Sequence, residues 1–376
     1  MDFSQYKSGD YKQQYQYKSF TPTFVNHEWE MNNSNLSLLL SQADNKLGEL
    51  NAFSQLIPDV DFFIKMHVNK EATSSSRIEG TQTNIEEALQ KIEYINPEKR
   101  DDWEEVQSYI KAMNKAVKAL DKLPVSGQLL KETHKILLQG VRGKNKQPGE
   151  FRSSQNWIGG ATINDAVFIP PHQNDVPDLM KDLECFLNEE NLPVPHLVRI
   201  AIAHYQFETI HPFLDGNGRL GRLLITLYLV SKGLLVKPTL YLSVFFEKHK
   251  SLYYDNLTRV RTHNDMIQWV KFFLEGVRQT SESSIQTFKS IITLRNKCEH
   301  KILTLGKKTK LAKDFLHYLY GNPIIDSQDV VSAFSISLPA VLRLIDDFIR
   351  LEILTEITGY KRNRVFVFTE YVKLFE

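Results

Sequence analysis

The hydrophobic and polar positions of the chain predict mostly helices, with two apolar helices on either side of one short break. Residues 195–210 are largely apolar and contain no Gly or Pro after the first position, which predicts a buried helix. Pro212 and Gly216 interrupt this pattern. A second helix is predicted beyond them, because leucines recur at i, i+3, i+4 and i+7, at Leu220, Leu223, Leu224 and Leu227. The break is therefore a tight loop that ends at a helix N-terminus.

This loop has the features of a phosphate-binding site. Unpaired backbone N–H groups and the positive end of the helix dipole attract anions at a helix N-terminus. Gly216 and Gly218 let the backbone approach phosphate oxygens without a clashing Cβ. Arg219 and Arg222 are three residues apart, so both guanidiniums project from one side of the first turn, where they suit terminal phosphates. We therefore expect the loop to hold a polyphosphate.

Two further loop residues supply a base and a metal ligand. Asp215 offers a hard oxygen to Mg²⁺, which binds one or two carboxylates together with substrate phosphates. His211 is the one nearby group whose unperturbed pKa lies near neutrality, which suits a general base. The loop is thus predicted to hold a nucleoside triphosphate and to deprotonate an attacking hydroxyl.

The run from His211 to Arg222 resembles the signature of the Fic family, HPFx(D/E)GNGRxxR, at every specified position. The resemblance implies transfer of AMP from ATP to a Ser, Thr or Tyr hydroxyl of a protein, with His211 as the base and Asp215 as the Mg²⁺ ligand. Some relatives have Lys at this position and transfer phosphate, and Gly218 argues against phosphate transfer by this chain. The resemblance implies a nucleotide cradle made of Gly216, Asn217, Gly218, Arg219, Leu220, Gly221 and Arg222.

A second stretch, from Ser75 to Gly80, resembles the inhibitory-helix signature of the same family, (S/T)xxxE(G/N). Glu79 stands near the end of a predicted helix, where its charge gains nothing from the dipole. The resemblance pairs Glu79 with Arg222, which would otherwise grip the γ-phosphate, and so implies autoinhibition. A solvated surface glutamate is the other interpretation.

The inhibitory stretch lies on a helix that the apolar pattern also predicts. Phe62, Phe63, Met66 and Val68 have helical spacing, and Gly80 is a natural stop for a helical turn. Residues 83–86 resemble a capping box that starts the next helix.

Residues 157–171 predict a β-hairpin between the two motifs. Two apolar arms flank Asn164 and Asp165, which favour a turn, and paired prolines end the second arm. In Fic proteins the equivalent flap docks the target as an added strand, and an exposed strand edge has the unpaired groups for that role. The docking residues would be Val167, Phe168, Ile169 and Pro170. A structural hairpin packed on the helical core is the alternative.

Tyr254 is a candidate nucleotide contact about thirty residues after the loop. In family members with a tyrosine pair like Tyr253 and Tyr254, the second tyrosine commonly borders the nucleotide. Tyrosines on a helix also complete hydrophobic cores, and the sequence leaves both interpretations open.

The C-terminal seventy residues predict three helices and a hairpin, which resembles a winged helix. The helices are expected at 310–320, 327–334 and 337–350, and the strands at 354–357 and 364–368. From residue 307 onward ten Lys or Arg stand against nine Asp or Glu, so a basic DNA-binding face is not evident. The predicted recognition helix has Asp346 and Asp347, whereas the tip is basic at Lys361, Arg362 and Arg364. Nucleic-acid binding is therefore not favoured over protein binding.

Composition adds few constraints. The chain has 376 residues, ordinary hydrophobic (42%) and charged (24%) fractions and a net charge of +1, so it offers no bulk attraction to nucleic acid or membrane. The longest apolar run is far too short to cross a bilayer. Cys185 and Cys298 stand far apart and in no metal-ligand spacing, which favours a reduced, cytoplasmic setting.

We therefore expect a mainly α protein with a Fic-type helical core, a small β-hairpin flap and a C-terminal winged helix. The expected regions are a polar arm, flexible or lying on the surface (1–33), an N-terminal helical region with the inhibitory motif (34–101), the catalytic core (102–280), a linker helix (281–306) and the winged-helix module (307–376). Its partners would be ATP and a hydroxyl-bearing protein, which could be the chain itself. Self-association through the long helix stays open. The alternatives are a winged-helix regulator with a nucleotide-sensing site, and an enzyme that removes AMP at the same site.

Overall fold

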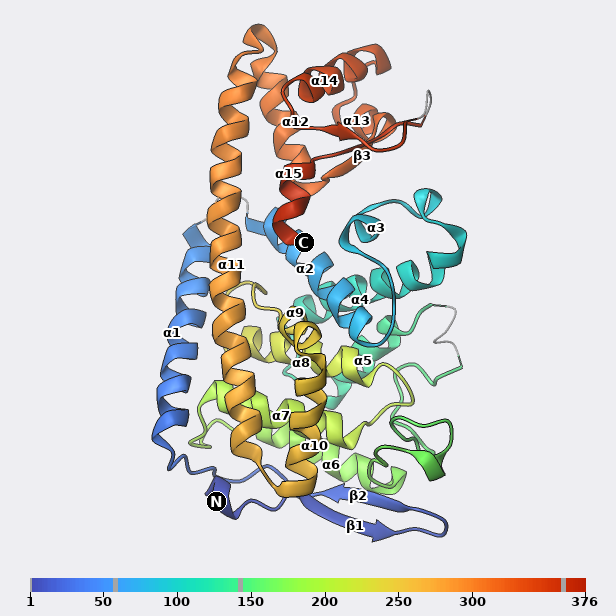
Figure 1. Ribbon diagram of the computed structural model, residues 1–376, viewed down its shortest axis with the longest axis vertical. Helices are drawn as coiled ribbons and strands as arrows, with labels where there is room; N and C mark the ends of the chain where they lie inside the picture. Colours follow the sequence, from blue (N-terminus) through green and yellow to red (C-terminus); the bar gives the residue numbers. More distant parts are fainter. Residues whose placement is uncertain (1, 57–59, 141–144, 360–362) are drawn as a thin grey trace.

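The computed structural model describes residues 2–56, 60–140, 145–359 and 363–376. The fold is mainly helical with small antiparallel sheets, as predicted (Figure 1). The helices are α1 (Ser34–Leu56), α2 (Val60–Ile78), α3 (Ile85–Leu89), α4 (Arg100–Ala119), α5 (Gly127–Leu137), α6 (Val176–Asn188), α7 (His196–Ile210), α8 (Asn217–Ser231), α9 (Ser243–Lys248), α10 (Lys250–His263), α11 (Met266–Leu303), α12 (Thr309–Gly321), α13 (Ser327–Phe334), α14 (Leu338–Arg350) and α15 (Thr369–Val372). The strands are β1 (Gly9–Gln13), β2 (Lys18–Pro22), β3 (Ile324–Asp326), β4 (Thr355–Glu356) and β5 (Val365–Val367).

Helices α7 and α8 form the centre of the fold, and the hydrophobic pattern predicts both of them correctly. Every residue of α7 from Leu197 to Ile210 is buried, because other helices surround it. Trp269 of α11 donates a hydrogen bond to the carbonyl oxygen of Ala201 at 2.8 Å, which ties the long helix to this centre. Burial of apolar surface, at roughly 25 cal/mol per Å², is the main stabilising contribution.

Helix α11 is one continuous helix of 38 residues that runs beside α1 along one side of the molecule (Figure 1). The expected boundary between residues 280 and 281 falls inside it, so the linker helix is an extension of a core helix. Its polar second half stays helical because neighbouring elements cover its apolar stripe. The Phe288 ring, for example, lies 6.4 Å from Phe53 and 6.3 Å from Phe63 between centroids.

The polar arm (1–33), expected to be flexible or to lie on the surface, contains regular structure in its described residues. Strands β1 and β2 form an antiparallel hairpin from Gly9 to Pro22. Trp29 lies 5.0 Å from Phe3 and 4.9 Å from Tyr6 between ring centroids, and all three are buried. These aromatic residues are widely spaced in a polar sequence, so they show no periodic pattern that would predict their packing.

The predicted flap turns back on itself, but it lacks the two regular strand arms that the sequence predicts. A single antiparallel bridge joins Ile158 to Phe168, and residues 163–165 form a 3₁₀ turn. Gly159 and Gly160 have φ angles of +69° and +75°, which extended strands do not allow. The Asp165 carboxylate accepts the backbone N–H of Ala161 at 2.8 Å, and this bond favours the turn over a strand.

The C-terminal module contains the three helices and two strands at the predicted positions. It also contains a third strand, giving an antiparallel sheet in the order β3-β5-β4. Strand β3 was missed because it has three residues and leads directly into α13. Helices α13 and α14 meet at 115°. The assignment as a winged helix stays a prediction, and the tip residues Lys361 and Arg362 lie outside the described residues.

The C-terminal module packs against the N-terminal helices (Figure 1). Lys65 of α2 donates to the carbonyl oxygen of Gly321 at 2.6 Å. Lys91, which follows α3, contacts Asp326 at 2.7 Å and Asp329 at 2.6 Å, so the start of α13 faces the region that contains the inhibitory motif. Across the described ranges, no single helix combines the length and the apolarity needed to cross a membrane.

Candidate active site

Residues of the loop between α7 and α8 fix its shape through their backbone angles and hydrogen bonds. Helix α7 ends at Ile210, and the next residue, His211, has a left-handed backbone with φ of +50°. Gly216 has φ of +74° just before α8. The Asn217 side chain accepts the N–H of Phe213 at 2.9 Å and donates to the Phe213 carbonyl oxygen at 2.8 Å. The sequence suggests Asn217 as a nucleotide ligand, but its amide side chain is occupied in shaping the loop.

Two residues that the sequence analysis did not identify fix the loop from outside. The Arg152 guanidinium donates to the carbonyl oxygens of His211 at 3.0 Å and Pro171 at 2.5 Å. The Asn156 amide donates to the carbonyl oxygen of Phe213 at 2.9 Å. Both lie more than fifty residues from the loop in sequence, so no local motif could indicate them.

His134 of α5 supports the far side of the loop. Its Nδ1 accepts the N–H of Gly149 at 2.9 Å, so its Nε2 carries the proton and donates to the Asp215 carbonyl oxygen at 2.9 Å. Its ring stacks on Phe213 with the centroids 3.8 Å apart. Burial lowers the pKa of His134 to about 4, which keeps the tautomer that the loop requires.

His211 has the protonation state that a general base needs. Burial lowers the pKa of His211 to about 4, and the nearby Arg152 guanidinium acts in the same direction. The imidazole is therefore neutral at neutral pH and can accept a proton.

Asp215 and Arg219 lie next to each other where the loop meets α8. Asp215 accepts the N–H of Gly216 at 2.5 Å and lies 3.6 Å from the Arg219 guanidinium, with 42% of its side chain exposed. Arg219 is buried and contacts Glu105 at 3.1 Å. Among the described residues no group of three or more candidate ligands is placed to hold a metal. One accessible carboxylate still fits Mg²⁺, because substrate phosphates and water complete its coordination.

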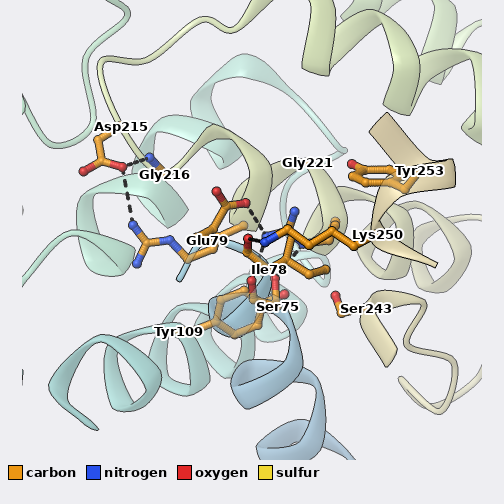
Figure 2. A network of polar contacts seen from close by, with 12 residues as sticks. Ser75, Ile78, Glu79, Tyr109, Asp215, Gly216, Gly221, Ser243, Lys250 and Tyr253 are labelled. Atoms are coloured by element: carbon orange, nitrogen blue, oxygen red, sulfur yellow. Dashed lines mark hydrogen bonds and ion pairs between the residues drawn. The ribbon is translucent and has the colours of Figure 1, made fainter. Parts of the chain in front are cut away.

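Arg222 is buried and bonds to Ser75 and Glu79, which lie close together in Figure 2. Its Nε donates to Ser75 Oγ at 2.9 Å, and its Nη2 donates to the Ser75 carbonyl oxygen at 2.9 Å and to Glu79 Oε1 at 2.7 Å. Burial would raise the pKa of Glu79, but Arg222 outweighs it and the pKa is lowered. The Glu79 side chain remains 36% exposed, so its carboxylate borders the open part of the site.

Gly218 provides the space that Glu79 occupies. A Cβ at Gly218 would lie 2.2 Å from Glu79 Oε1 and 3.0 Å from the Arg222 guanidinium. The glycine that the sequence predicts to let phosphate approach therefore also leaves room for the Glu79 carboxylate. Leu220 and Gly221 are buried in α8, and the Leu220 side chain belongs to the hydrophobic core.

Further contacts position helix α2, and no sequence motif predicts any of them. Lys250 donates to the Ile78 carbonyl oxygen at 2.7 Å and so caps the end of α2. Glu71, one turn before Ser75, is buried and accepts from Tyr109 at 3.0 Å and from the Ser243 hydroxyl at 2.5 Å. Gly80 has φ of +110° and ends the helix as predicted. The next helix begins one residue later than expected, with Asn84 and Glu87 forming the capping box.

Tyr254 lies beside this network. Its side chain is 40% exposed, whereas Tyr253 is buried and its hydroxyl contacts Nε2 of His204 at 2.9 Å. Burial raises the pKa of Tyr254, and so does the nearby Glu79 carboxylate. Tyr253 therefore serves the core, and Tyr254 remains available to a ligand.

Of the four predicted docking residues of the flap, Val167 alone is exposed, and the backbone at Ile169 is already paired. Val167 is 79% exposed, whereas Phe168 is buried under the Arg261 guanidinium at 3.9 Å from the ring centroid. The Ile169 carbonyl oxygen accepts the N–H of Phe20 in β2 at 2.9 Å. Pro170 is buried. The backbone edge at Ile169 is thus already paired within the chain.

Comparison with known proteins places this loop and this helix in one family. Residues 37–118 match the family description "Fic/DOC family N-terminal", and residues 124–229 match "Fic/DOC family". The chain belongs to the Fic/DOC family. The first matched region of this Fic chain contains Ser75 and Glu79, and the second contains His211 to Arg222.

Among curated relatives, the chain is 38% identical over 134 residues to a protein adenylyltransferase Fic of Culex quinquefasciatus, covering 35% of this chain and 24% of the relative. The Fic chain thus spans about a quarter of the length of that relative. A Fic family protein from Desulfovibrio desulfuricans G20 has a similar fold, with a TM-score of 0.56 and 21% identity over 90% of this chain and 97% of that one. A Fic-domain signalling protein from Bacteroides thetaiotaomicron VPI-5482 gives 0.52 and 20% over 68% and 97%.

Proposed function

We propose that the chain is an autoinhibited protein adenylyltransferase that moves AMP from ATP to a Ser, Thr or Tyr hydroxyl of a protein. The observation that carries this proposal is the arrangement of one loop. A neutral His211 precedes the free N-terminus of α8, and Arg219 and Arg222 follow in its first turns. The relatives named protein adenylyltransferase Fic support the same activity.

In the proposed reaction, the hydroxyl oxygen of the target attacks the α-phosphorus while His211 accepts the hydroxyl proton. The bond between the α-phosphorus and the oxygen that bridges to the β-phosphate breaks, and pyrophosphate leaves with that electron pair. The backbone N–H groups of residues 216–222 and the two guanidiniums would bind the phosphates. Asp215 would hold Mg²⁺, which offsets charge on the phosphates.

Inhibition in this proposal is competition for Arg222. Ser75 and Glu79 occupy the Nε and Nη2 edge of the guanidinium. A γ-phosphate that needed the same donors would be left without them, and the Glu79 carboxylate would repel it. ATP would then bind with its α-phosphorus out of line with the target hydroxyl, which is sufficient to suppress transfer.

The target would approach past the exposed Val167 of the flap, and Tyr254 would border the nucleotide. The paired edge at Ile169 leaves less free backbone for strand addition than a bare hairpin offers, so contacts with the Val167 side chain would contribute more. Self-association and protein binding by the C-terminal module stay predictions.

The test uses ATP labelled at either the α- or the γ-phosphate, incubated with Mg²⁺, the chain and lysate protein. Adenylyl transfer predicts covalent protein label from the α-phosphate alone, and none with His211→Ala. Label from the γ-phosphate would instead indicate phosphate transfer. ATP binding without covalent label, for wild type and for Glu79→Gly, would contradict the enzyme assignment.

A further inference from the structure

A cavity of about 160 Å³ lies behind the inhibitory helix, between α2, α9 and α11. Its lining includes His67, Glu71, Tyr241, Phe245 and Lys248. A cavity of roughly 150 Å³ accommodates a benzene-sized molecule. The cavity does not include any residue of the catalytic loop, and the proposed transfer reaction assigns it no role.

Two buried polar atoms at this cavity lack partners. His67 Nε2 and the Tyr241 hydroxyl have no hydrogen-bond partner within the part of the chain that the structure describes, although the residues are only 7% and 5% exposed. Their rings are nearly parallel, at 28°, with centroids 6.5 Å apart. Buried polar groups are normally hydrogen-bonded, so a small rotation of either side chain toward a group bound in the cavity would supply the missing partner.

The charges at the cavity favour an anion. Lys70 and Lys248 both line it, and Lys248 is exposed at the surface. Lys70 makes one long contact of 3.5 Å to the backbone oxygen of Glu376. The one acidic residue in the lining, Glu71, already accepts from Tyr109 and Ser243. Two ammonium groups and a tyrosine hydroxyl can therefore donate to a ligand carboxylate, while Phe245 and Val244 offer apolar surface to a ring.

We propose that this cavity binds a small monocyclic organic anion, such as an aromatic carboxylate, and that the bound anion strengthens inhibition by Glu79. The effect of the anion on inhibition rests on the proposed function, whereas its binding to the cavity does not.

Helix α2 connects the cavity to Arg222 through one face. His67, Glu71, Ser75 and Glu79 are spaced four residues apart, so they lie in a row along the helix. Glu71 is anchored by Tyr109 and Ser243, and Ser75 and Glu79 hold Arg222. The cavity exists in the conformation in which Glu79 engages Arg222. A ligand that binds this conformation better than the released one shifts the population toward it, and productive ATP binding must weaken the ligand by the same factor.

Binding is tested on the full chain by ¹⁹F NMR titration with 4-fluorobenzoate, and with 4-fluorobenzyl alcohol as the neutral counterpart. Saturable binding of the benzoate, with the alcohol about tenfold weaker or undetected, is expected because a charged hydrogen bond is lost. Tyr241→Phe and Lys248→Gln should each weaken the benzoate by about tenfold. Tyr241→Phe removes an unpaired hydroxyl, so the fold should be retained, and Lys181→Gln on the exposed face of α6 serves as the matched control.

Failure of the benzoate to saturate, equal binding of the alcohol, or equal binding by all three variants would overturn the site.

For regulation, benzoate should lower adenylyl labelling by wild type and leave Glu79→Gly labelling unchanged. Benzoate binding without an effect on wild-type labelling would overturn the coupling. If no variant ever labels protein, the proposed function fails, and the NMR titration still decides whether the site exists.

Discussion

Glu79 and Arg222 are 143 residues apart in sequence, yet the Glu79 carboxylate accepts a hydrogen bond of 2.7 Å from the Arg222 guanidinium. Ser75, one helical turn earlier, accepts two further hydrogen bonds from the Nε and Nη2 edge of the same guanidinium. One edge of the arginine that suits a terminal phosphate is therefore already paired within the protein, and under the proposed mechanism the free energy of this pairing opposes productive nucleotide binding.

Ser75→Ala is predicted to relieve inhibition in part. The substitution removes the buried hydrogen bond from Arg222 Nε to Ser75 Oγ and keeps the ion pair with Glu79. A net loss of about 1 kcal/mol corresponds to a rise of roughly fivefold in initial adenylyl labelling, which a time course with labelled ATP measures. Thr73→Ala is the control and should not raise labelling, because the Thr73 hydroxyl donates to the carbonyl oxygens of Asn69 and Lys70 in the same helix.

Arg152→Lys is predicted to lower kcat by about 100-fold, because a displacement of the base by about 1 Å has that effect. Lysine keeps the charge but cannot reach the His211 and Pro171 carbonyl oxygens together, as the Arg152 fork does. Nucleotide affinity should change less than threefold, since the phosphate-binding residues are intact. The measurement is kcat alongside ATP affinity. A large loss of affinity with an unchanged kcat would show that Arg152 serves the nucleotide instead.

The buried histidines predict loss of stability in mild acid. Burial lowers the pKa of His134 to about 4 from its ordinary value of 6.5, so the unfolded state binds more protons below pH 6.5. The free energy of unfolding must therefore fall as pH falls through this window. His134 alone contributes a loss of about 1.4 kcal/mol between about pH 7.5 and pH 5.5. His134→Gln should reduce the pH dependence in urea melts by that amount, and an unchanged slope would contradict the assignment.

Lys91→Gln is predicted to loosen the contact between the C-terminal module and the N-terminal helices. Lys91 contacts Asp326 and Asp329, but its side chain is 48% exposed, so the loss in stability should be below about 1 kcal/mol. Hydrogen exchange should quicken at the start of α13 without a matching change in α7. Lys99→Gln breaks a comparable pair with Glu87 inside the N-terminal region and should leave α13 unchanged.

The sequence predicts the parts of the fold whose apolar pattern is regular. Helices α7, α13 and α14 lie within a residue or so of their expected positions, because their apolar spacing and end signals agree. The N-terminal β-hairpin was missed because its burial depends on contacts such as that between Ser8 and Asn264, which are distant in sequence. The flap failed as a regular hairpin because Gly159 and Gly160 adopt left-handed backbone angles.

The candidate site was predictable where its residues are neighbours in sequence. His211, Asp215 and Arg222 stand in one run, and the resemblance supplied the partner for Arg222. Arg152, Asn156 and His134 act on the loop through backbone carbonyl groups, so their side chains read as ordinary polar residues in the sequence. Glu71 and Lys250 position α2 in the same way, and a structure is required to identify them.

The central claim is that Glu79 restrains a competent adenylyl-transfer site. Its most direct test compares wild type, Glu79→Gly and Glu79→Gly with His211→Ala for covalent label from α-labelled ATP. Release of a coupling of about 1–3 kcal/mol predicts a rise of roughly 5- to 150-fold for Glu79→Gly, and loss of all label when His211→Ala is added. Equal labelling by wild type and Glu79→Gly, or labelling that persists without His211, would contradict the account.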